Sequence, residues 1–367
     1  MVHPHLCSRA GLFTRHAVVL AEGEVQPSGV FKVRQLGLPP PEPRQRTLEA
    51  LGNVDPLRKK AVAPSPTSVL SVGSANYAGI AAAAADAADA AEVGDVAFDN
   101  AMLVVLSDVW LDAPSVLRRL AEVFRGYEAV GAQLVGSGKA ATPLASFFTF
   151  VLCGNFASAK HATASSTGLQ LRTLFKGLAT VLAKTPMLAR HAHFVLVPGP
   201  DDPSLAAPSV LPRAGLPRSL CTSLLEVIEH LTLASSPCRL MLCGQHIVIH
   251  REELLVKARR MCVLPPVVTN EETLNDHLVK TLIDNAHLCP LPPTEQAVYW
   301  QQEHAMWLHP APDVLVLCDR QKQWQSVYEE TLAFNPGDFS SGLSWMTYQP
   351  NERTAEESSL PEESSLS

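Results

Sequence analysis

The sequence predicts an α/β protein in which layered β-sheets are covered by flanking helices. From about residue 98 onward, apolar runs of strand length alternate with segments of helical periodicity, a pattern typical of α/β domains. Apolar residues make up 47% of the 367 residues and charged residues 18%. The chain can therefore bury a sizeable core and is neither a coiled coil, a collagen nor a disordered polar chain. Its length suggests about two domains.

Six apolar runs in this part are expected to form strands. They span residues 102–108, 147–156, 193–202, 238–244, 246–252 and 313–319. Between the first two runs, apolar side chains from Val116 to Phe124 recur at helical spacing behind Asp112, a candidate N-cap. Apolar residues from Leu171 to Leu182 predict a second helix. Each helix can cover a face of the sheet, which makes one continuous core feasible.

Composition divides the chain into four segments. Two β-like runs, Ala17–Ala21 and Val30–Leu36, flank a Pro-Ser-Gly turn, and the proline-rich residues 39–43 end regular structure. A connector rich in Pro, Ser and Ala follows, and the last residues are acidic and serine-rich, which predicts disorder. The expected segments are a β segment over 1–43, a linker or insert over 44–97, the α/β domain over 98–350 and a disordered tail over 351–367.

Charge and cysteine usage exclude several classes. The net charge is −7, whereas a dedicated nucleic-acid binder carries a basic footprint, so any contact with DNA is expected to be indirect or weak. The eight cysteines form no C-x-x-C pair and lie mostly in apolar runs, as buried thiols of a reducing compartment do. With no apolar run near the roughly 18 residues that span a bilayer and no signal peptide, we expect a soluble intracellular protein.

Three expected strands end in polar motifs, namely LSDVWLD (106–112), LCGNFAS (152–158) and VPGPDDP (197–203). In open α/β sheets this edge is where ligands and metals bind. The arrangement resembles that of the calcineurin-like metallophosphoesterases, whose strand tips carry D-x-H, G-D, G-N-H and G-H-x-H and hold two metals. Such a site needs carboxylate and imidazole ligands that converge on both ions.

Most of these ligands are replaced in this sequence. Asp108 survives, but Trp110 stands at the position of the ligand histidine, and Asn155, after Gly154, replaces the bridging aspartate. After Gly199, Pro200 and Asp201 take the places of Asn and His, and Asp202 follows. The last motif is Cys318-Asp319-Arg320-Gln321, which puts a permanent positive charge where metal ligands are expected. We therefore predict no catalytic residue, no metal and no cofactor. The alternative is an active metal-dependent phosphoesterase or nuclease that uses Asp108, Asp201, Asp202 and Asp319.

A longer set of motifs, in consistent order over residues 12–345, resembles the B subunits of DNA polymerase epsilon. It includes LVVLSDVWLD, FVLCGNF, FVLVPGPDDP, HIVIHREELL, HLVKTLIDNAHLCPLP, LHPAPDVLVLCD and FNPGDF. The upstream FTRHAVVLAEG and GVFKVRQLGLPPPEP resemble the end of that family's OB domain. The B subunits of polymerases alpha and delta share the ancestral fold but are less similar in these motifs.

The resemblance implies a non-catalytic scaffold subunit of a nuclear replicative polymerase. In that family an inactive calcineurin-like phosphoesterase domain and an OB domain bind the zinc-binding C-terminal region of the catalytic subunit. Residues 1–43 would then be a partial OB-fold segment, because two strand runs cannot close a barrel of about five strands. Either the chain is a fragment, or its N-terminus is divergent. An interaction module outside replication is a further alternative.

Other signals have structural interpretations. Cys238, Cys243, His246 and His250 have zinc-like spacing, but residues four apart in a strand lie about 13 Å apart, so the two histidines could not share one ion. Ser107 lacks a G-x-S-x-G elbow. Several tryptophans could stack on bases, yet no basic stripe accompanies them, so we expect core or interface positions. The basic cluster 58–60 is either a nuclear address or a solvated linker.

Overall fold

A computed structural model of the chain describes residues 11–50, 70–73, 101–136, 148–158, 167–203, 209–266, 268 and 272–361. The chain divides into two compact units. Unit 1 consists of Met1–Ala61, Glu253–Asp313 and Ser326–Ala333, and unit 2 of Val62–Glu252, Val314–Gln325 and Phe334–Ser367. No helix within the described ranges is long and apolar enough to cross a membrane.

Unit 2 contains a six-stranded mixed sheet with the strand order β16-β15-β5-β6-β7-β8. The strands β5 to β8 run parallel, whereas β15 pairs antiparallel with both β5 and β16. Their bounds are Met102–Leu106 (β5), Phe148–Cys153 (β6), His193–Val197 (β7), His230–Leu233 (β8), Ser344–Gln349 (β15) and Thr354–Ser359 (β16).

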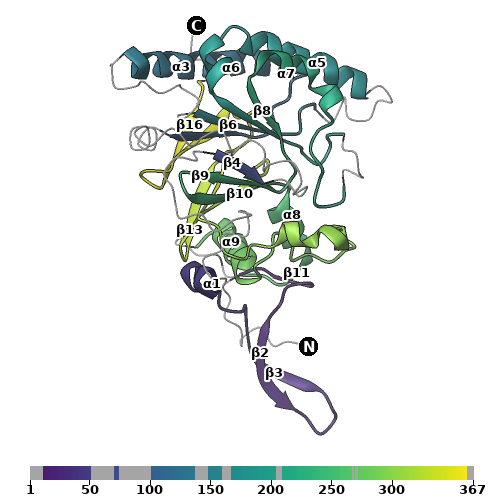
Figure 1. Ribbon diagram of the computed structural model, residues 1–367. Helices are drawn as coiled ribbons and strands as arrows, with labels where there is room; N and C mark the ends of the chain where they lie inside the picture. Colours follow the sequence, from purple (N-terminus) through teal and green to yellow (C-terminus); the bar gives the residue numbers. More distant parts are fainter. Residues whose placement is uncertain are drawn as a thin grey trace. The chain divides into compact units, whose positions relative to one another are not determined.

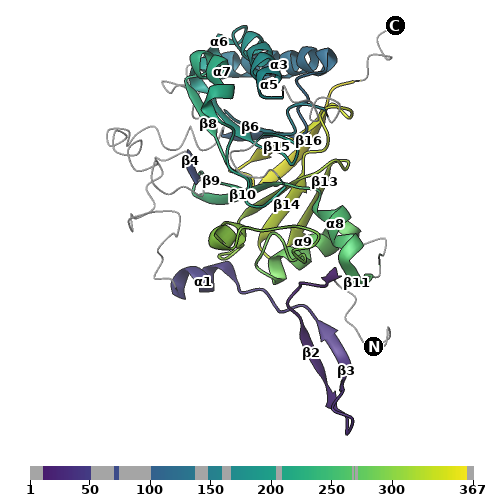
Figure 2. The same cartoon turned by 90° about the vertical axis from the view of Figure 1, so that its right-hand side faces the viewer.

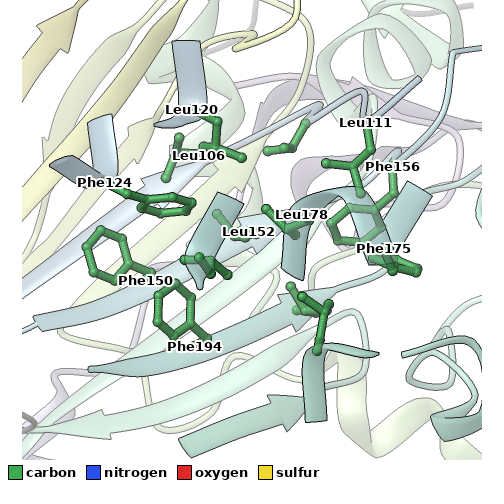
Figure 3. Close-up of a cluster of buried hydrophobic side chains, with 14 of the residues drawn as sticks. Leu106, Leu111, Leu120, Phe124, Phe150, Leu152, Phe156, Phe175, Leu178 and Phe194 are labelled. Carbon is green, nitrogen blue, oxygen red and sulfur yellow. The ribbon is translucent and has the colours of Figure 1, made fainter. Parts of the chain in front are cut away.

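Helices cover one face of this sheet, and Figure 1 shows them as a layer above β6 and β8. They are Pro114–Gly136 (α3), Thr167–Leu182 (α5), Pro186–His191 (α6), Thr222–Val227 (α7) and the 3-10 turn Arg218–Leu220 (η2). Alternate strand residues such as Phe148, Phe150 and Leu152 point into this layer, because successive side chains of a strand face opposite sides. Figure 3 shows Phe150 and Leu152 with Phe124 of α3, Phe194 of β7 and neighbouring leucines.

The intervening residues of the same strands, such as Leu103, Val105 and Val151, are equally buried. They face the other side, where a second six-stranded sheet lies (Figures 1 and 2). Its order is β13-β14-β12-β10-β9-β4. The bounds are Leu70–Gly73 (β4), Cys238–Leu242 (β9), Gln245–Arg251 (β10), Val314–Cys318 (β12), Trp324–Tyr328 (β13) and Thr331–Asn335 (β14), of which the last two have residues in both units. Burial on both faces explains why the central strands are continuous apolar runs.

Unit 1 combines short strands and helices. Its elements are Phe13–Thr14 (β1), Leu20–Val25 (β2), Phe31–Gly37 (β3), Arg44–Ala50 (α1), Leu254–Met261 (α8), Cys262–Leu264 (β11), Leu274–Asp284 (α9) and Trp300–Met306 (η3). Thr273 and Asp276 form a capping box that starts α9. The same helix binds the chain before β1, since Gly11 N–H donates to His277 Nδ1 at 3.0 Å and Leu12 N–H to Thr281 Oγ1 at 2.7 Å.

The predicted α/β class is confirmed by these mixed sheets, and the six expected strands are all present with ends shifted by a few residues. Three elements differ from the sequence prediction. The helix α1 and strand β4 lie in the expected linker, and β16 lies where the tail was expected to be disordered. Strand β16 exists because its backbone pairs with β15 while its two glutamates stay exposed, which suits the edge of a sheet. Near the N-terminus the second expected run forms β3, whereas the first shares only Leu20 and Ala21 with β2, which extends to Val25; the two strands form an antiparallel hairpin.

A histidine pair lies where β7 and β8 begin. His193 and His230 are register partners, and their rings stack with centroids 4.9 Å apart. Burial, with a smaller contribution from the neighbouring imidazole, lowers the pKa of His193 to about 4. His193 is therefore neutral at physiological pH, and protonating it in the folded state is costly.

Candidate functional site

Five strands end at one edge of unit 2. Because β5, β6 and β7 are parallel neighbours, Asp108, Gly154 and Gly199 follow their strands at the same side of the sheet. The second sheet contributes β10 and β12, which are also parallel and end at Arg251 and Cys318. The structure therefore brings the motifs singled out from the sequence together.

A fully buried arginine occupies the centre of this edge. One terminal nitrogen of Arg251 lies 2.9 Å from Oδ1 and 2.8 Å from Oδ2 of Asp108. Its Nε–H donates to the carbonyl of Gly154 at 2.8 Å, and its other terminal nitrogen donates to the carbonyl of Cys318 at 3.2 Å. Both charged side chains are 0% exposed. The guanidinium thus joins the tips of three other strands through one fork of donors.

A second arginine approaches the same carboxylate from the solvent side. Arg320 Nε lies 3.3 Å from Asp108 Oδ1, and its terminal nitrogen lies 3.8 Å from Asp201 Oδ2. The guanidinium carbon lies 5.7 Å from the ring centroid of Trp110, a cation–π arrangement. Asp108 itself has a left-handed backbone with φ +54°. The positive charge that the sequence predicted at Arg320 therefore pairs with Asp108, the metal-ligand position that the first strand-tip motif retains.

Asn155 and Asp201 form a reciprocal pair at the tips of β6 and β7. Asn155 Nδ2 donates to Asp201 Oδ2 at 2.8 Å, and Asp201 N–H donates to Asn155 Oδ1 at 2.9 Å. The neutral amide thus serves both as donor and as acceptor, which the aspartate of a metal site could not do. Close approach explains the glycines, because a Cβ on Gly154 would collide with Asp202 and one on Gly199 with Asn155.

Asp202 holds two loops with its carboxylate. Oδ1 accepts the N–H of Phe156 and Oδ2 accepts the N–H of Gly199, both at 2.8 Å. Burial raises the pKa of Asp202 to about 6, although these two hydrogen bonds and Arg251 favour the charged form. The carboxylate therefore acts as a structural acceptor inside the protein.

The pKa values of His193 and Asp202 give opposite pH dependences. Between pH 6.5 and about 4, unfolded His193 holds more protons than folded His193, so its contribution to stability falls with decreasing pH by up to about 3 kcal/mol. Asp202 is protonated in the folded state up to about pH 6 but only below about 4 when unfolded, so acidification through this window stabilises the fold.

We expect His193→Gln to abolish the part of the acid destabilisation that comes from His193. Urea unfolding of both proteins at pH 7.5 and pH 4.5 measures it: the free energy of unfolding should fall less for His193→Gln than for the unmodified chain. The matched variant His230→Gln keeps the burial that dominates the His193 shift and should retain most of the pH dependence. Equal losses on acidification in His193→Gln and in the unmodified chain would show that His193 is not the group responsible.

In the last motif, the carboxylate of Asp319 accepts hydrogen bonds from Gln321 and Asn335. Asp319 accepts from Gln321 N–H at 3.0 Å, from Gln321 Nε2 at 2.6 Å and from Asn335 Nδ2 at 2.6 Å. Cys318 contributes its carbonyl to the cluster, while its thiol lies 3.6 Å from the thiol of Cys153. Pro200 lies in the turn after β7. Across the described part of the chain, no group of three or more His, Cys, Asp or Glu side chains is arranged to hold a metal ion.

Of the four residues with zinc-like spacing, Cys238 lies in β9 and both histidines in β10, whereas Cys243 lies in the turn between the two strands. His246 and His250 both lie in β10. His246 Nε2 lies 3.4 Å from Arg239 Nη1, and His250 Nδ1 lies 3.4 Å from Ser236 Oγ. Both imidazoles thus have polar neighbours other than a cysteine.

Arg251 is the residue that the sequence interpretation missed. Its neighbour Glu252 forms a second buried ion pair with Arg213, and Arg213 also donates to the carbonyl of Arg251 at 2.9 Å. The signal was present, because Arg251 and Glu252 end an apolar strand run just as Asp108 does. Applying the strand-tip rule to residues 246–252 would have identified both.

The buried ion pair and the hydrogen bonds fix the strand tips relative to one another. Each carboxylate of the arrangement already accepts hydrogen bonds from the protein or pairs with one of its arginines. The part of the chain that contains these strand tips also matches a known protein family. The sequence profile of the B subunits of DNA polymerases alpha and epsilon matches residues 103–326, and the chain belongs to this family.

Within it, the chain resembles the epsilon subunits. It is 34% identical over 354 residues to the B subunit of DNA polymerase epsilon from Arabidopsis thaliana, which covers 95% of this chain and 60% of that protein. It is 34% identical over 352 residues to the human DNA polymerase epsilon subunit 2, with 96% and 59% covered. The chain thus spans about 60% of the length of these relatives.

Solved structures with a similar arrangement are more distant. One is an archaeal phosphodiesterase, with a TM-score of 0.36, 12% identity, and coverage of 71% of this chain and 99% of that chain. Another is the hypothetical protein PH1004 from Pyrococcus horikoshii OT3, with a TM-score of 0.31, 9% identity, and coverage of 72% and 90%.

Proposed function

We propose that this chain is a non-catalytic accessory subunit of the DNA polymerase epsilon holoenzyme and acts in chromosomal replication. The observation that carries the proposal is the position of Arg251 and Arg320 on Asp108. Two guanidiniums repel divalent cations, and the aspartate that a metal would need is already paired. Membership of the polymerase B-subunit family supports the accessory role.

The proposed mechanism is binding. Residues 98–350 would be a calcineurin-like phosphoesterase domain whose metal ligands have been replaced, and residues 1–43 the end of an OB domain. Together they would hold the zinc-binding C-terminal region of the catalytic subunit in the nucleus. An obligate interface of this kind buries well above roughly 1,600 Å² of surface. The domain boundaries expected from the sequence, 1–43, 44–97, 98–350 and 351–367, belong to this proposal.

Co-purification tests the proposal. The 367-residue chain is co-expressed with the C-terminal region of the epsilon catalytic subunit and analysed by size-exclusion chromatography with light scattering. We expect a one-to-one complex that survives the column. The matched control replaces the partner with the corresponding region of the alpha catalytic subunit, which should elute separately. Failure to co-elute by a chain whose circular dichroism shows it to be folded would contradict the proposal.

An enzymatic assay tests the alternative. With manganese and bis(p-nitrophenyl) phosphate, we expect no turnover above that of the buffer with metal. Turnover that disappears in Asp108→Ala would instead establish a metal-dependent phosphoesterase and overturn the scaffold role.

A further inference from the structure

Positive charge is concentrated on α3, α5 and α6 of unit 2, whereas α7 carries the exposed Glu226 and is followed by Glu229. The described residues within 113–200 include seven Lys and Arg residues but only two acidic residues, Glu122 and Glu128, in a chain whose net charge is −7. The two glutamates are already engaged. Glu122 pairs with Arg119 at 2.9 Å, and Glu128 accepts the backbone N–H groups of Met187 and Leu188 at the start of α6.

Five of the exposed basic side chains lie on α3, α5 and α6, and Lys184 lies in the turn between α5 and α6. Six are exposed, namely Arg118, Arg125, Arg172, Lys176, Lys184 and Arg190; we call them the basic layer. The helices α3 and α5 each follow a strand of the parallel pair β5–β6, so they run in the same direction, and they pack against each other. Figures 1 and 2 both show them side by side on the outer side of the sheet.

Spacing places these charges on shared faces. Arg118 and Arg125 are seven residues apart, about two helical turns or roughly 10 Å along α3. Arg172 and Lys176 are neighbours at i and i+4 on α5. Both sets begin near the N-terminal ends of their helices, so parallel packing puts them at similar heights.

The composition of this face favours a phosphate backbone over a protein. Protein interfaces need apolar or aromatic anchors at their centre. On the described parts of α3 and α5, Val130 is the large apolar side chain that is exposed, whereas Phe124 and Phe175 are buried in the core. Single-stranded nucleic acid requires aromatic stacking platforms, and this face offers arginine and lysine instead.

We propose that the basic layer binds the phosphodiester backbone of duplex DNA without reading its sequence. The inference goes beyond the accessory role, which concerns a protein partner. Contacts with six phosphates predict a slope of about −5 in a plot of log affinity against log salt concentration. Binding should therefore be measurable at low salt and weak at high salt.

Charge reversal tests the proposal. The full chain is titrated against a fluorescein-labelled 20-base-pair duplex at 50 to 200 mM NaCl, with fluorescence anisotropy as the readout. We expect Arg172→Glu/Lys176→Glu to weaken binding at least tenfold at 50 mM salt and to reduce the salt slope by about two. The control, Arg259→Glu/Lys322→Glu, changes the net charge equally at exposed sites outside the layer and should change the affinity less than twofold.

The other outcomes overturn the proposal. Equal weakening by both variants would indicate general electrostatics. Tighter binding of a single strand of the same length, or binding of a polyglutamate peptide without binding of the duplex, would assign the face to another ligand. The one-to-one complex with the catalytic region should be unchanged in Arg172→Glu/Lys176→Glu, which separates failure of this inference from failure of the accessory role.

Discussion

Replacing Arg251 with methionine is expected to lower the free energy of unfolding by about 3–5 kcal/mol, because it leaves the carboxylate of Asp108 buried without its main counter-charge. The carbonyls of Gly154 and Cys318 lose their side-chain donors in the same variant. Urea or guanidinium unfolding followed by circular dichroism measures the loss. Methionine keeps most of the apolar volume, so the effect reports the charge and its hydrogen bonds.

Two variants make this result specific. Arg320→Met removes the arginine that is 40% exposed, and the expected cost is within about 1 kcal/mol because solvent screens that pair. The double variant Asp108→Asn/Arg251→Met removes both buried charges and should recover part of the loss, as a double-mutant cycle would show. A cost for Arg320→Met equal to that for Arg251→Met would contradict the central role given to Arg251.

The second large effect is expected from Phe150→Ala, at about 3–5 kcal/mol. Phe150 is 0% exposed and stacks on Phe194 with centroids 5.1 Å apart. It also makes edge contacts with Phe124 at 5.4 Å and Tyr127 at 5.3 Å (Figure 3 shows the first). Truncation would open a cavity between the sheet and α3 and remove these three aromatic contacts together with a fourth, to Phe148 at 6.2 Å.

Guanidinium unfolding measures this variant as well. Phe150→Leu retains much of the volume and should cost clearly less than the alanine variant. As a matched control, Val327→Ala removes a side chain that is 70% exposed and should change stability by less than about 0.5 kcal/mol. If Phe150→Ala unfolded with the same midpoint as the unmodified chain, the layer between β6 and α3 would not be the well-packed core described.

The buried strands were predictable because their chemistry is local. The strands β6 and β12 bury both faces, so every residue is apolar or small and the run stands out. The edge strand β16 carries two glutamates and two serines, and its formation depends on pairing with β15. Strand β4 is four residues long and pairs with β9, far away in sequence. Pairing partners of this kind are absent from local composition, so both strands were missed.

The sequence predicted which residues lie at the strand tips, but it did not predict the ion pairs and hydrogen bonds that those residues form. Strand tips identified Asp108, Asn155 and Asp202, because the edge of a parallel sheet collects the residues that follow each strand. The ion pair of Asp108 joins it to a residue 143 positions away. That contact depends on how the two sheets of unit 2 are packed, which local sequence does not specify.

Because the Arg251 guanidinium connects the strand tips, the stability of this edge of unit 2 does not depend on a bound metal ion. A bound ion is an exchangeable component, so an edge assembled around one would gain or lose stability with the free concentration of that ion. Here the positive charge is a covalent part of the chain, and an arginine stays protonated throughout the physiological pH range. The four strand tips that Arg251 and its partners connect are therefore assembled at a fixed stoichiometry as soon as the chain folds, at any concentration of divalent ions.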